Sequence, residues 1–375
     1  MSAHPHPHSQ QTFHPTMDGR GIFDDKPALV YWEMTQACDL ACQHCRAEAI
    51  PDHHPLELTT VEGKALLREL RAFGDPPPHL VMTGGDALKR DDLFELLTYA
   101  IDLGLPTSVA PSATHLLSRD ILQRFKDMGV HSISLSLDGS CSETHDAFRG
   151  VEGCFEKTLR AAHDAGEVGL PLQVNTLVTA DTLQDLPAIY GLVRELGLMR
   201  WSLFFLINIG RGQGLEPITP IQAERLFNWI EEERPKAGFA IGTTEAPPAR
   251  RVTFQRLTHR GMTSDQIRRT PAGRGFGIRD GNGIMFISHL GAVTPSGFVP
   301  LAAGNVRQQS PVELYRHSEL FTSVRATDRY SGKCGRCGYR NICGGSRARA
   351  YAATGDLLGS DPLCAYEPRG VEALV

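Results

Sequence analysis

The sequence predicts an α/β fold, in which six strand–helix units build a parallel sheet and a small cysteine-rich domain follows. Short apolar runs alternate with amphipathic helical stretches from residue 28 to residue 233, and this alternation is typical of parallel strands joined by crossover helices. Seven of the nine cysteines form two tight groups, one near each end of the chain. A chain of 375 residues can also bury a sizeable core without disulfide bridges.

The strand–helix units follow one another in a regular order. Strands are predicted at residues 29–34, 80–83, 106–111, 131–138, 172–178 and 201–207, and helices at residues 60–73, 91–103, 118–128, 153–165, 183–196 and 220–233. Because the loops after parallel strands gather at the carboxyl ends of those strands, we expect the functional residues at that edge of the sheet.

The remaining segments suggest four parts. Residues 1–27 are rich in His, Pro and Ser without apolar periodicity, and we expect a disordered tail. Residues 28–215 form the strand–helix core. Residues 216–283 begin with a helix and continue as an Arg-, Gly- and Thr-rich linker of weak periodicity. Residues 284–375 form the C-terminal domain, with a predicted hairpin at 284–288 and 292–294 and a short helix at 311–315.

The composition narrows the class of protein. The hydrophobic fraction of 41%, the charged fraction of 22% and the net charge of −5 are ordinary for a soluble globular protein, and they suggest neither nucleic acid nor an anionic membrane as a partner. No apolar run approaches the roughly 20 residues that span a bilayer. The polar N-terminus lacks the apolar core of a signal peptide, so we expect a cytoplasmic protein.

The first cysteine group, Cys38, Cys42 and Cys45, has the spacing C-x3-C-x2-C in the loop after the first predicted strand. Disulfides are rare in a reducing cytosol, so clustered cysteines indicate a metal site. Three thiolates leave one iron of a [4Fe–4S] cluster open to an exchangeable ligand. Structural zinc is the alternative, and it requires four closed ligands; no fourth cysteine is positioned here, although His44 could be the fourth ligand.

Spacing and position together resemble the radical S-adenosylmethionine (SAM) superfamily, in which three such cysteines hold the cluster and SAM completes the fourth iron. The resemblance covers about residues 28–215. It implies a partial (β/α)6 TIM barrel with a small C-terminal iron–sulfur domain. It also implies SAM and a [4Fe–4S] cluster as cofactors, and it places His44 beside the adenine, where the family usually has an aromatic residue.

Further motifs occur in the family's order. Gly84, Gly85 and Asp86 follow the second strand and match the family's Gly-Gly-Glu-Pro segment, which holds the SAM ammonium group. Glycines there allow close approach of a backbone to a ligand. Asp86-Ala87 stand where the family has Glu-Pro, which shortens the acidic arm. An ordinary turn between strand and helix is the alternative.

The fourth strand carries Ser134, Ser136 and Asp138 on one face, opposite an apolar face. Because an unsatisfied buried polar group costs on the order of 1–3 kcal/mol, a bound ligand is the natural partner of this stripe. The resemblance assigns the strand to the SAM ribose and carboxylate. It also implies Arg149 in the following His-Asp-x-x-Arg-Gly segment as a carboxylate clamp, with a structural ion pair as the alternative.

Two features after the fifth and sixth strands fit the wall around the SAM nucleoside. They are Asn175 and the glycine run at residues 210–214. A satisfied strand asparagine and an ordinary glycine loop are the alternatives.

The second cysteine group has the spacing C-x2-C-x5-C-x20-C, and it consists of Cys334, Cys337, Cys343 and Cys364. Four thiolates also suit a zinc ribbon. The segment resembles the SPASM/Twitch extension of radical SAM enzymes, which implies an auxiliary [4Fe–4S] cluster. Ligands for a second, inner auxiliary cluster are missing near Ser296 and Ser346, so we predict one auxiliary cluster. The two remaining cysteines, Cys141 and Cys154, are interpreted as small buried hydrophobic residues.

The C-terminal segment and the first cysteine loop together most resemble the branch of heme and heme d1 biosynthesis enzymes that oxidise porphyrin propionates. An excess of arginine between residues 249 and 280 would suit a substrate with several carboxylates. Its arginines are Arg250, Arg251, Arg256, Arg260, Arg268, Arg269, Arg274 and Arg279. A solvated or ion-paired surface is the alternative.

The predicted activity is reductive cleavage of SAM to a 5′-deoxyadenosyl radical that abstracts hydrogen from a small-molecule or peptide substrate. Flavodoxin or ferredoxin is the expected electron donor. A maturase of ribosomally made peptides is the competing enzyme, although residues 1–27 offer no room for the peptide-binding domain such enzymes often carry. A two-cluster electron carrier is the non-enzyme alternative, but a carrier has no use for a SAM pocket.

Overall fold

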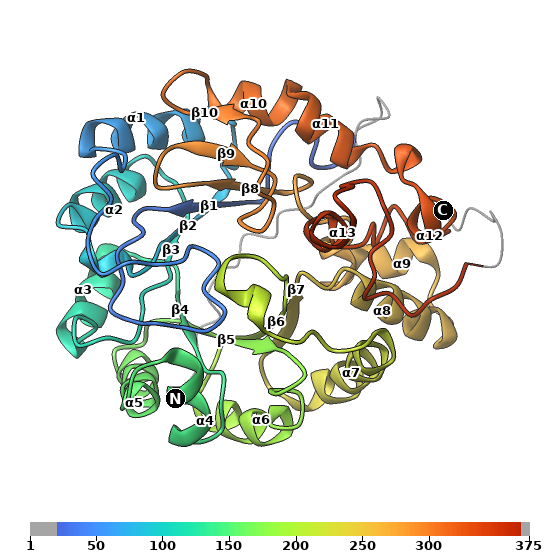
Figure 1. The fold of residues 1–375 in the computed structure, drawn as a ribbon, viewed down its shortest axis with the longest axis horizontal. Coiled ribbons are helices and arrows are strands. Elements are labelled where there is room, and N and C mark those ends of the chain that lie inside the picture. Colours follow the sequence, from blue (N-terminus) through green and yellow to red (C-terminus); the bar gives the residue numbers. More distant parts are fainter. Residues whose placement is uncertain (1–20, 369–375) are drawn as a thin grey trace, which may run out of the picture.

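A computed structural model describes residues 21–368. Its centre is a ten-stranded sheet with the order β10-β9-β8-β1-β2-β3-β4-β5-β6-β7, curved into an open barrel with helices around its outside (Figure 1). The strands are β1 (Leu29–Glu33), β2 (His79–Thr83), β3 (Thr107–Val109), β4 (Ile133–Ser136), β5 (Leu172–Val178), β6 (Arg200–Phe205), β7 (Ala240–Thr244), β8 (Ile284–Ile287), β9 (Ala292–Thr294) and β10 (Gly304–Asn305).

The α/β prediction is confirmed, and the sheet is longer than the sequence suggested. All six predicted strands are present and parallel. A seventh parallel strand, β7, follows β6 in the segment interpreted as a linker, where the short run AIGTT gives only a weak strand pattern. The predicted hairpin of β8 and β9 forms, but the other edge of β8 pairs in parallel with β1. The C-terminal segment therefore extends the same sheet.

Helices cover the outer face of the sheet, and their ends follow local signals. Thr59 and Glu62 form a capping box at the start of α1, and Gly129 ends α3 with φ 86°. The helices are α1 (Thr60–Arg71), α2 (Leu93–Asp102), α3 (Arg119–Met128), α4 (Ser142–Arg149), α5 (Cys154–Glu167), α6 (Leu186–Glu195), α7 (Pro220–Glu233), α8 (Pro248–His259), α9 (Ser264–Arg269), α10 (Pro311–His317), α11 (Glu319–Arg325), α12 (Gly332–Gly335) and α13 (Arg347–Thr354).

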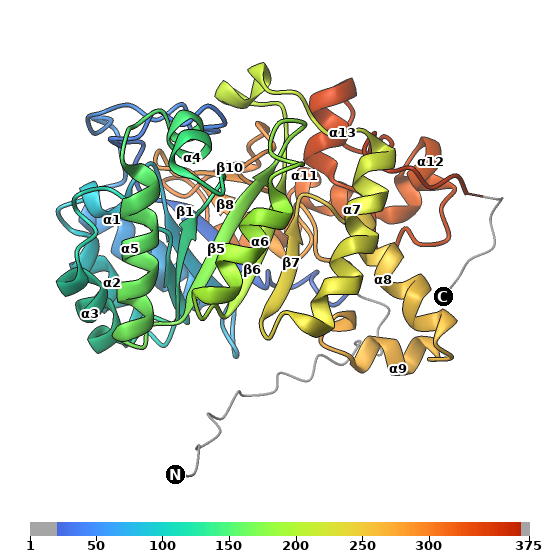
Figure 2. The same cartoon turned by 90° about the horizontal axis from the view of Figure 1, so that it is seen from below.

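The main core lies between the sheet and this helical layer. It contains fully buried side chains such as Trp32, Leu67 and Trp201. In both views the cysteine-rich C-terminal segment with α12 and α13 lies on the same side of the molecule as α8 (Figures 1 and 2). No helix among residues 21–368 combines the length and the apolar character needed to cross a bilayer.

The expected disordered tail is partly corrected. Residues 1–20 lie outside the described part of the chain, but residues 21–27 pack against α10 and α11. Phe23 is buried, its carbonyl accepts a hydrogen bond from the Tyr315 hydroxyl at 2.7 Å, and Asp24 pairs with Arg325. A single aromatic residue without periodicity gave no signal of this packing.

Candidate active site

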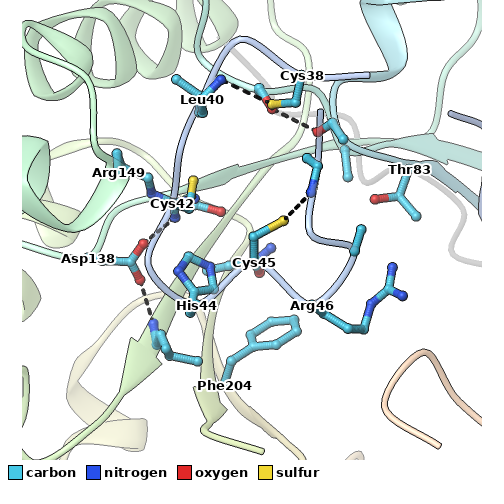
Figure 3. Close-up of a pocket in the computed structure, with 18 of the residues that line it drawn as sticks. Cys38, Leu40, Cys42, His44, Cys45, Arg46, Thr83, Asp138, Arg149 and Phe204 are labelled. Atoms are coloured by element: carbon cyan, nitrogen blue, oxygen red, sulfur yellow. Dashed lines mark hydrogen bonds and ion pairs between the residues drawn. The ribbon is translucent and has the colours of Figure 1, made fainter. Parts of the chain in front are cut away.

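A cavity of about 280 Å³ opens at the carboxyl ends of β1 to β6. Figure 3 shows side chains around it from the cysteine loop after β1, from the segment after β4 and from β6. The residues predicted from the sequence that line this cavity are Cys38, Cys42, His44, Cys45, Gly84, Gly85, Ser134, Ser136, Asp138, Arg149 and Asn175. The expectation that functional residues gather at this edge of the sheet therefore agrees with the structure.

Each of the three cysteine sulfurs near the cavity accepts a hydrogen bond. The donors are the Leu40 amide to Cys38 at 3.4 Å, the Arg149 guanidinium to Cys42 at 3.5 Å and the Ala49 amide to Cys45 at 3.3 Å. Donors aimed at sulfur stabilise thiolates and tune iron–sulfur sites. The three thiols and their donors therefore fit a cluster with three protein ligands.

Gly84 and Gly85 bring the loop after β2 against the cysteine loop. The Gly85 amide donates to the Thr35 carbonyl at 2.8 Å. A Cβ atom on Gly85 would lie 2.4 Å from the Ala37 carbonyl oxygen, and one on Gly84 would lie 2.7 Å from that of Thr35. Any side chain would push the two loops apart, so glycine is required for this close approach.

Asp86 does not line the cavity, which corrects its predicted contact with the SAM ammonium group. The carboxylate is fully buried and accepts hydrogen bonds from the amides of Leu88 at 3.1 Å and Ser112 at 3.2 Å and from the Thr114 hydroxyl at 3.0 Å. Burial raises the pKa of Asp86 despite these donors. The short side chain caps the 3-10 turn after β2 instead of reaching the cavity.

The polar stripe on β4 faces the cavity as predicted, since Ser134 and Ser136 line it while Ile133 and Leu135 are buried on the other face. Asp138 pairs with Arg149, and both side chains are at least nine-tenths buried. Burial alone would raise the pKa of Asp138, but the Arg149 charge and the Leu177 amide help to hold it below its usual value. Arg149 therefore forms the buried ion pair weighed as the alternative, and because it also lines the cavity, its contact with the SAM carboxylate stays a prediction.

His44 packs against the C-terminal end of α4. Its ring stacks on Phe148 with centroids 4.9 Å apart. Burial, together with the Arg149 charge, lowers the pKa of His44 to about 4, so the ring is neutral. Its Nδ1 atom is buried and has no hydrogen-bond partner among the described residues. A ligand in the cavity is a suitable partner for this atom.

Asn175, on β5, accepts a hydrogen bond from Gln173 at 2.7 Å.

A charged group that was not predicted from the sequence lies at the end of β1. Glu33 is buried and pairs with Arg46, which lines the cavity, and with Nδ1 of His289 at 2.7 Å. Burial alone would raise the pKa of Glu33, but Arg46 and His289 lower it. The group connects the cysteine loop to the segment after β8. A charged residue inside an otherwise apolar strand was the available signal.

Two sulfurs of the second cysteine group, those of Cys334 and Cys343, lie close to Gly345. The Gly345 amide donates to Cys343 at 3.4 Å, and a Cβ atom at this glycine would lie 3.2 Å from the Cys334 sulfur. The Cys337 sulfur accepts a hydrogen bond from the Tyr339 amide at 3.4 Å. Burial raises the pKa of the Cys364 thiol to about 11, so metal binding there must displace a proton.

The arginine-rich segment does not form one carboxylate-binding surface. Arg251 on α8 is buried and pairs with Glu224, and Arg256 pairs with Glu232 at 2.8 Å. Arg279 donates to the Tyr330 hydroxyl at 2.8 Å. None of the arginines from 250 to 279 lines the cavity. Residues 248–259 form helix α8. From this helix the charges of Arg250 and Arg251 act on the second cysteine group, where they lower the pKa values of Cys343 and Cys364 against the larger effect of burial.

The positions expected for an inner auxiliary cluster hold hydroxyl groups with protein partners. The Ser346 hydroxyl donates to Glu245 at 2.6 Å and accepts the Arg349 amide at 3.0 Å, and the Ser296 hydroxyl accepts the Phe298 amide at 3.3 Å. Burial, together with the charge of Asp280, raises the pKa of Glu245 well above its usual value. This region is therefore a hydrogen-bonded polar network.

Replacing Glu245 with Gln should change how stability depends on pH. The raised pKa means that the folded state holds a proton on Glu245 more tightly than the unfolded chain, whose value is near 4.5. This contribution is complete below pH 4.5 and is lost as the pH rises through the folded value. Glu245→Gln should therefore gain stability relative to the wild type as the pH rises above 4.5. Thermal unfolding of anaerobic protein measures it, and parallel pH profiles would contradict the assignment.

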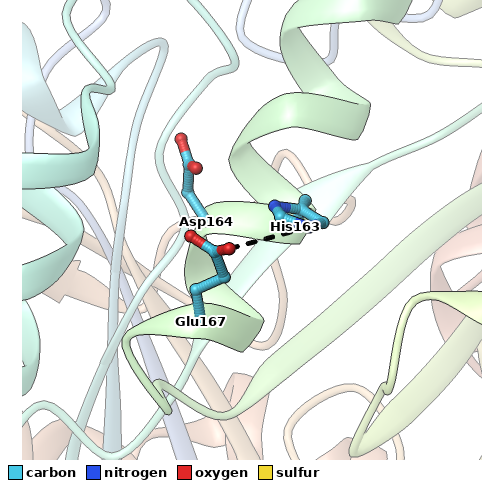
Figure 4. A group of neighbouring side chains, drawn as sticks. All are labelled: His163, Asp164 and Glu167. Carbon is cyan, nitrogen blue, oxygen red and sulfur yellow. Dashed lines mark ion pairs between the residues drawn. The ribbon is translucent and has the colours of Figure 1, made fainter.

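Three exposed or half-exposed side chains on α5 could also suggest a metal site. They are His163, Asp164 and Glu167 (Figure 4). One ring nitrogen of the histidine and one carboxylate oxygen of each acid lie within 4.8 Å of one another. Arg119 already contacts both carboxylates. We interpret the group as a surface ion-pair network.

Comparison with known proteins agrees with this geometry. Residues 32–193 match the family model of the radical SAM superfamily. The AdoMet-dependent heme synthase of Nitratidesulfovibrio vulgaris is 40% identical over 95% of this chain and 98% of its own length. The chain belongs to the radical SAM superfamily.

Other relatives support this membership. The AdoMet-dependent heme synthase of Methanosarcina barkeri is 36% identical over 91% of this chain and 97% of its own length. The crystal structure of Streptococcus suis SuiB bound to S-adenosylmethionine has a TM-score of 0.70 at 17% identity, covering 91% of this chain and 78% of that one. This likeness confirms the partial barrel of a radical SAM enzyme, and family membership implies SAM and a [4Fe–4S] cluster as cofactors.

Proposed function

We propose that this radical SAM enzyme oxidises propionate side chains of a tetrapyrrole. The observation that carries the proposal is similarity over nearly the whole chain, at 40% and 36% identity, to two proteins named heme synthases. A cavity with apolar walls and polar groups at the carboxyl ends of the strands suits such a substrate. The change of a propionate to a vinyl group releases carbon dioxide, one hydrogen atom and one electron.

Cys38, Cys42 and Cys45 are the residues that would hold the SAM-binding cluster. When bound, the cluster and SAM supply methionine and a 5′-deoxyadenosyl radical, which takes the hydrogen atom, while a one-electron acceptor takes the electron. The protein supplies position and water exclusion. The Gly84–Gly85 backbone, Ser134, Ser136 and the unpartnered Nδ1 of His44 are the polar groups that would contact SAM.

We assign Cys334, Cys337, Cys343 and Cys364 to a single auxiliary [4Fe–4S] cluster. A tetrahedral zinc site with bonds of about 2.3 Å brings its sulfurs to roughly 3.8 Å from one another. Among residues 21–368, the one group of three or more potential ligand atoms within 4.8 Å of one another is that of His163, Asp164 and Glu167, so no three of the four sulfurs are as close together as a zinc ion requires. The wider spacing favours a cluster of several irons over one ion.

Anaerobically reconstituted protein should contain about eight irons and no tightly held zinc, as two [4Fe–4S] clusters require. A variant in which Cys38, Cys42 and Cys45 are Ala should keep about four irons, because the two ligand sets share no residue. Iron and zinc analysis measures both proteins. About four irons with one zinc in the wild type would show that the C-terminal site is structural zinc.

Binding of a tetrapyrrole tests the substrate class. Iron coproporphyrin, which carries four propionates, should bind the SAM-loaded protein, and binding should shift the visible absorption of the porphyrin. Iron octaethylporphyrin should bind more weakly because it lacks carboxylates. Absence of binding by both compounds would remove the tetrapyrrole and leave maturation of a peptide as the stronger function. Flavodoxin or ferredoxin is the electron donor that we propose.

A further inference from the structure

Three arginines line the cavity, and they differ in their partners. Arg46 pairs with buried Glu33, and Arg149 pairs with buried Asp138. Arg211 forms no ion pair among the described residues, and its Nε and Nη2 atoms are buried without a hydrogen-bond partner. Because a buried guanidinium atom without an acceptor is costly, a site of this kind indicates an anionic ligand.

The turn that carries Arg211 is fixed against the cysteine loop. The Arg211 amide donates to the Cys45 carbonyl at 3.1 Å. Gly210 has φ 52°, and a Cβ atom there would lie 2.6 Å from the Arg46 carbonyl oxygen. Asn208 closes the other side of the turn by donating to the Leu215 carbonyl at 2.9 Å. The side chain therefore starts from a well-defined position beside the first cluster site.

The charge of Arg211 acts inside the cavity. Its side chain lines the cavity together with Cys42, His44 and Cys45. Since Glu33 and Asp138 balance the other two arginines, Arg211 leaves one positive charge at the wall. The same cavity has apolar lining residues, which include Phe204, Leu206, Ile207, Ile209 and Phe298. A positive charge beside an apolar wall suits a carboxylate attached to a flat apolar body.

We propose that Arg211 binds a carboxylate of the substrate and thereby sets the position of that side chain at the reaction centre. The inference rests on the proposed function and adds a specific recognition residue to it. It also replaces the arginine-rich segment as the source of carboxylate recognition, since none of those arginines lines the cavity.

The test compares iron coproporphyrin with its tetramethyl ester in anaerobic absorption titrations with SAM present. The wild type should bind the acid about 10- to 100-fold more tightly than the ester, because charged hydrogen bonds are lost in the ester. Arg211→Met should lose most of this difference, and Arg211→Lys should retain part of it. Arg225→Met is the matched control, since this arginine is exposed on α7 outside the cavity.

Iron content and substrate-free release of 5′-deoxyadenosine complete the test. Both should equal the wild-type values in Arg211→Met if the residue serves the substrate. Acid binding as tight as in the wild type would overturn the inference and leave the proposed function intact. Loss of substrate-free SAM cleavage at unchanged iron content would also overturn it, because Arg211 would then bind SAM. A wild type that binds neither porphyrin would refute the proposed function itself.

Discussion

A variant with Ala at Cys38, Cys42 and Cys45 should release no 5′-deoxyadenosine above background. These thiols line one cavity, each with a hydrogen-bond donor aimed at its sulfur, and without thiolates the open-iron cluster has no protein ligands. The measurement is chromatographic detection of 5′-deoxyadenosine after anaerobic reduction in the presence of SAM.

The remaining cysteines of the N-terminal half provide the controls. Cys154 is buried, as predicted, and also lines the cavity, where burial raises the pKa of its thiol. Cys141 is half-exposed at the start of α4 instead of buried. Cys141→Ala and Cys154→Ala should both keep SAM cleavage. Activity in the triple variant, or its loss in Cys154→Ala at unchanged fold, would contradict the three-ligand assignment.

Replacing Arg149 with Met should destabilise the protein by about 3–5 kcal/mol, because it leaves the Asp138 carboxylate buried without its counter-charge. The substitution also removes the guanidinium donor to the Cys42 sulfur. Urea unfolding of the cluster-free protein at pH 7 measures the change in the free energy of unfolding.

The double variant Asp138→Asn, Arg149→Met is the matched control. It removes both charges and should recover part of the lost stability, since an uncompensated buried charge costs more than a missing pair. If Arg149→Met lowered the free energy of unfolding by less than about 1 kcal/mol, the pair would contribute no more than an exposed salt bridge does. That result would contradict the expected cost of a buried charge without a partner.

Local patterns predicted much of the fold. The helix expected at residues 220–233 has those bounds in the structure as α7, where Thr219 and Gln222 form a capping box. The alternation in β4 identified its cavity face correctly. Strand β7 was missed because its five residues include a glycine and lie in a polar segment. The pairing of β8 with β1 joins residues more than 250 positions apart, which no local pattern encodes.

The same distinction holds for the site. Spacing identified the cysteines and the glycine pair, since both depend on neighbours in the chain. The direction of a long or charged side chain depends on distant partners: Asp86 faces Ser112 and Thr114, and Arg251 faces Glu224. Arg211 lay within a glycine run noted for SAM binding, but its lack of a partner is visible only in the folded chain.

The most direct test of the proposed activity is turnover of iron coproporphyrin by the reconstituted enzyme with SAM and a one-electron reductant. Mass spectrometry should detect products that have lost carbon dioxide and two hydrogens for each propionic acid group converted, namely the abstracted hydrogen and the carboxyl proton. 5′-Deoxyadenosine should form in step with these products. SAM cleavage without any change in the porphyrin mass, under conditions where the porphyrin is bound, would contradict the proposed reaction.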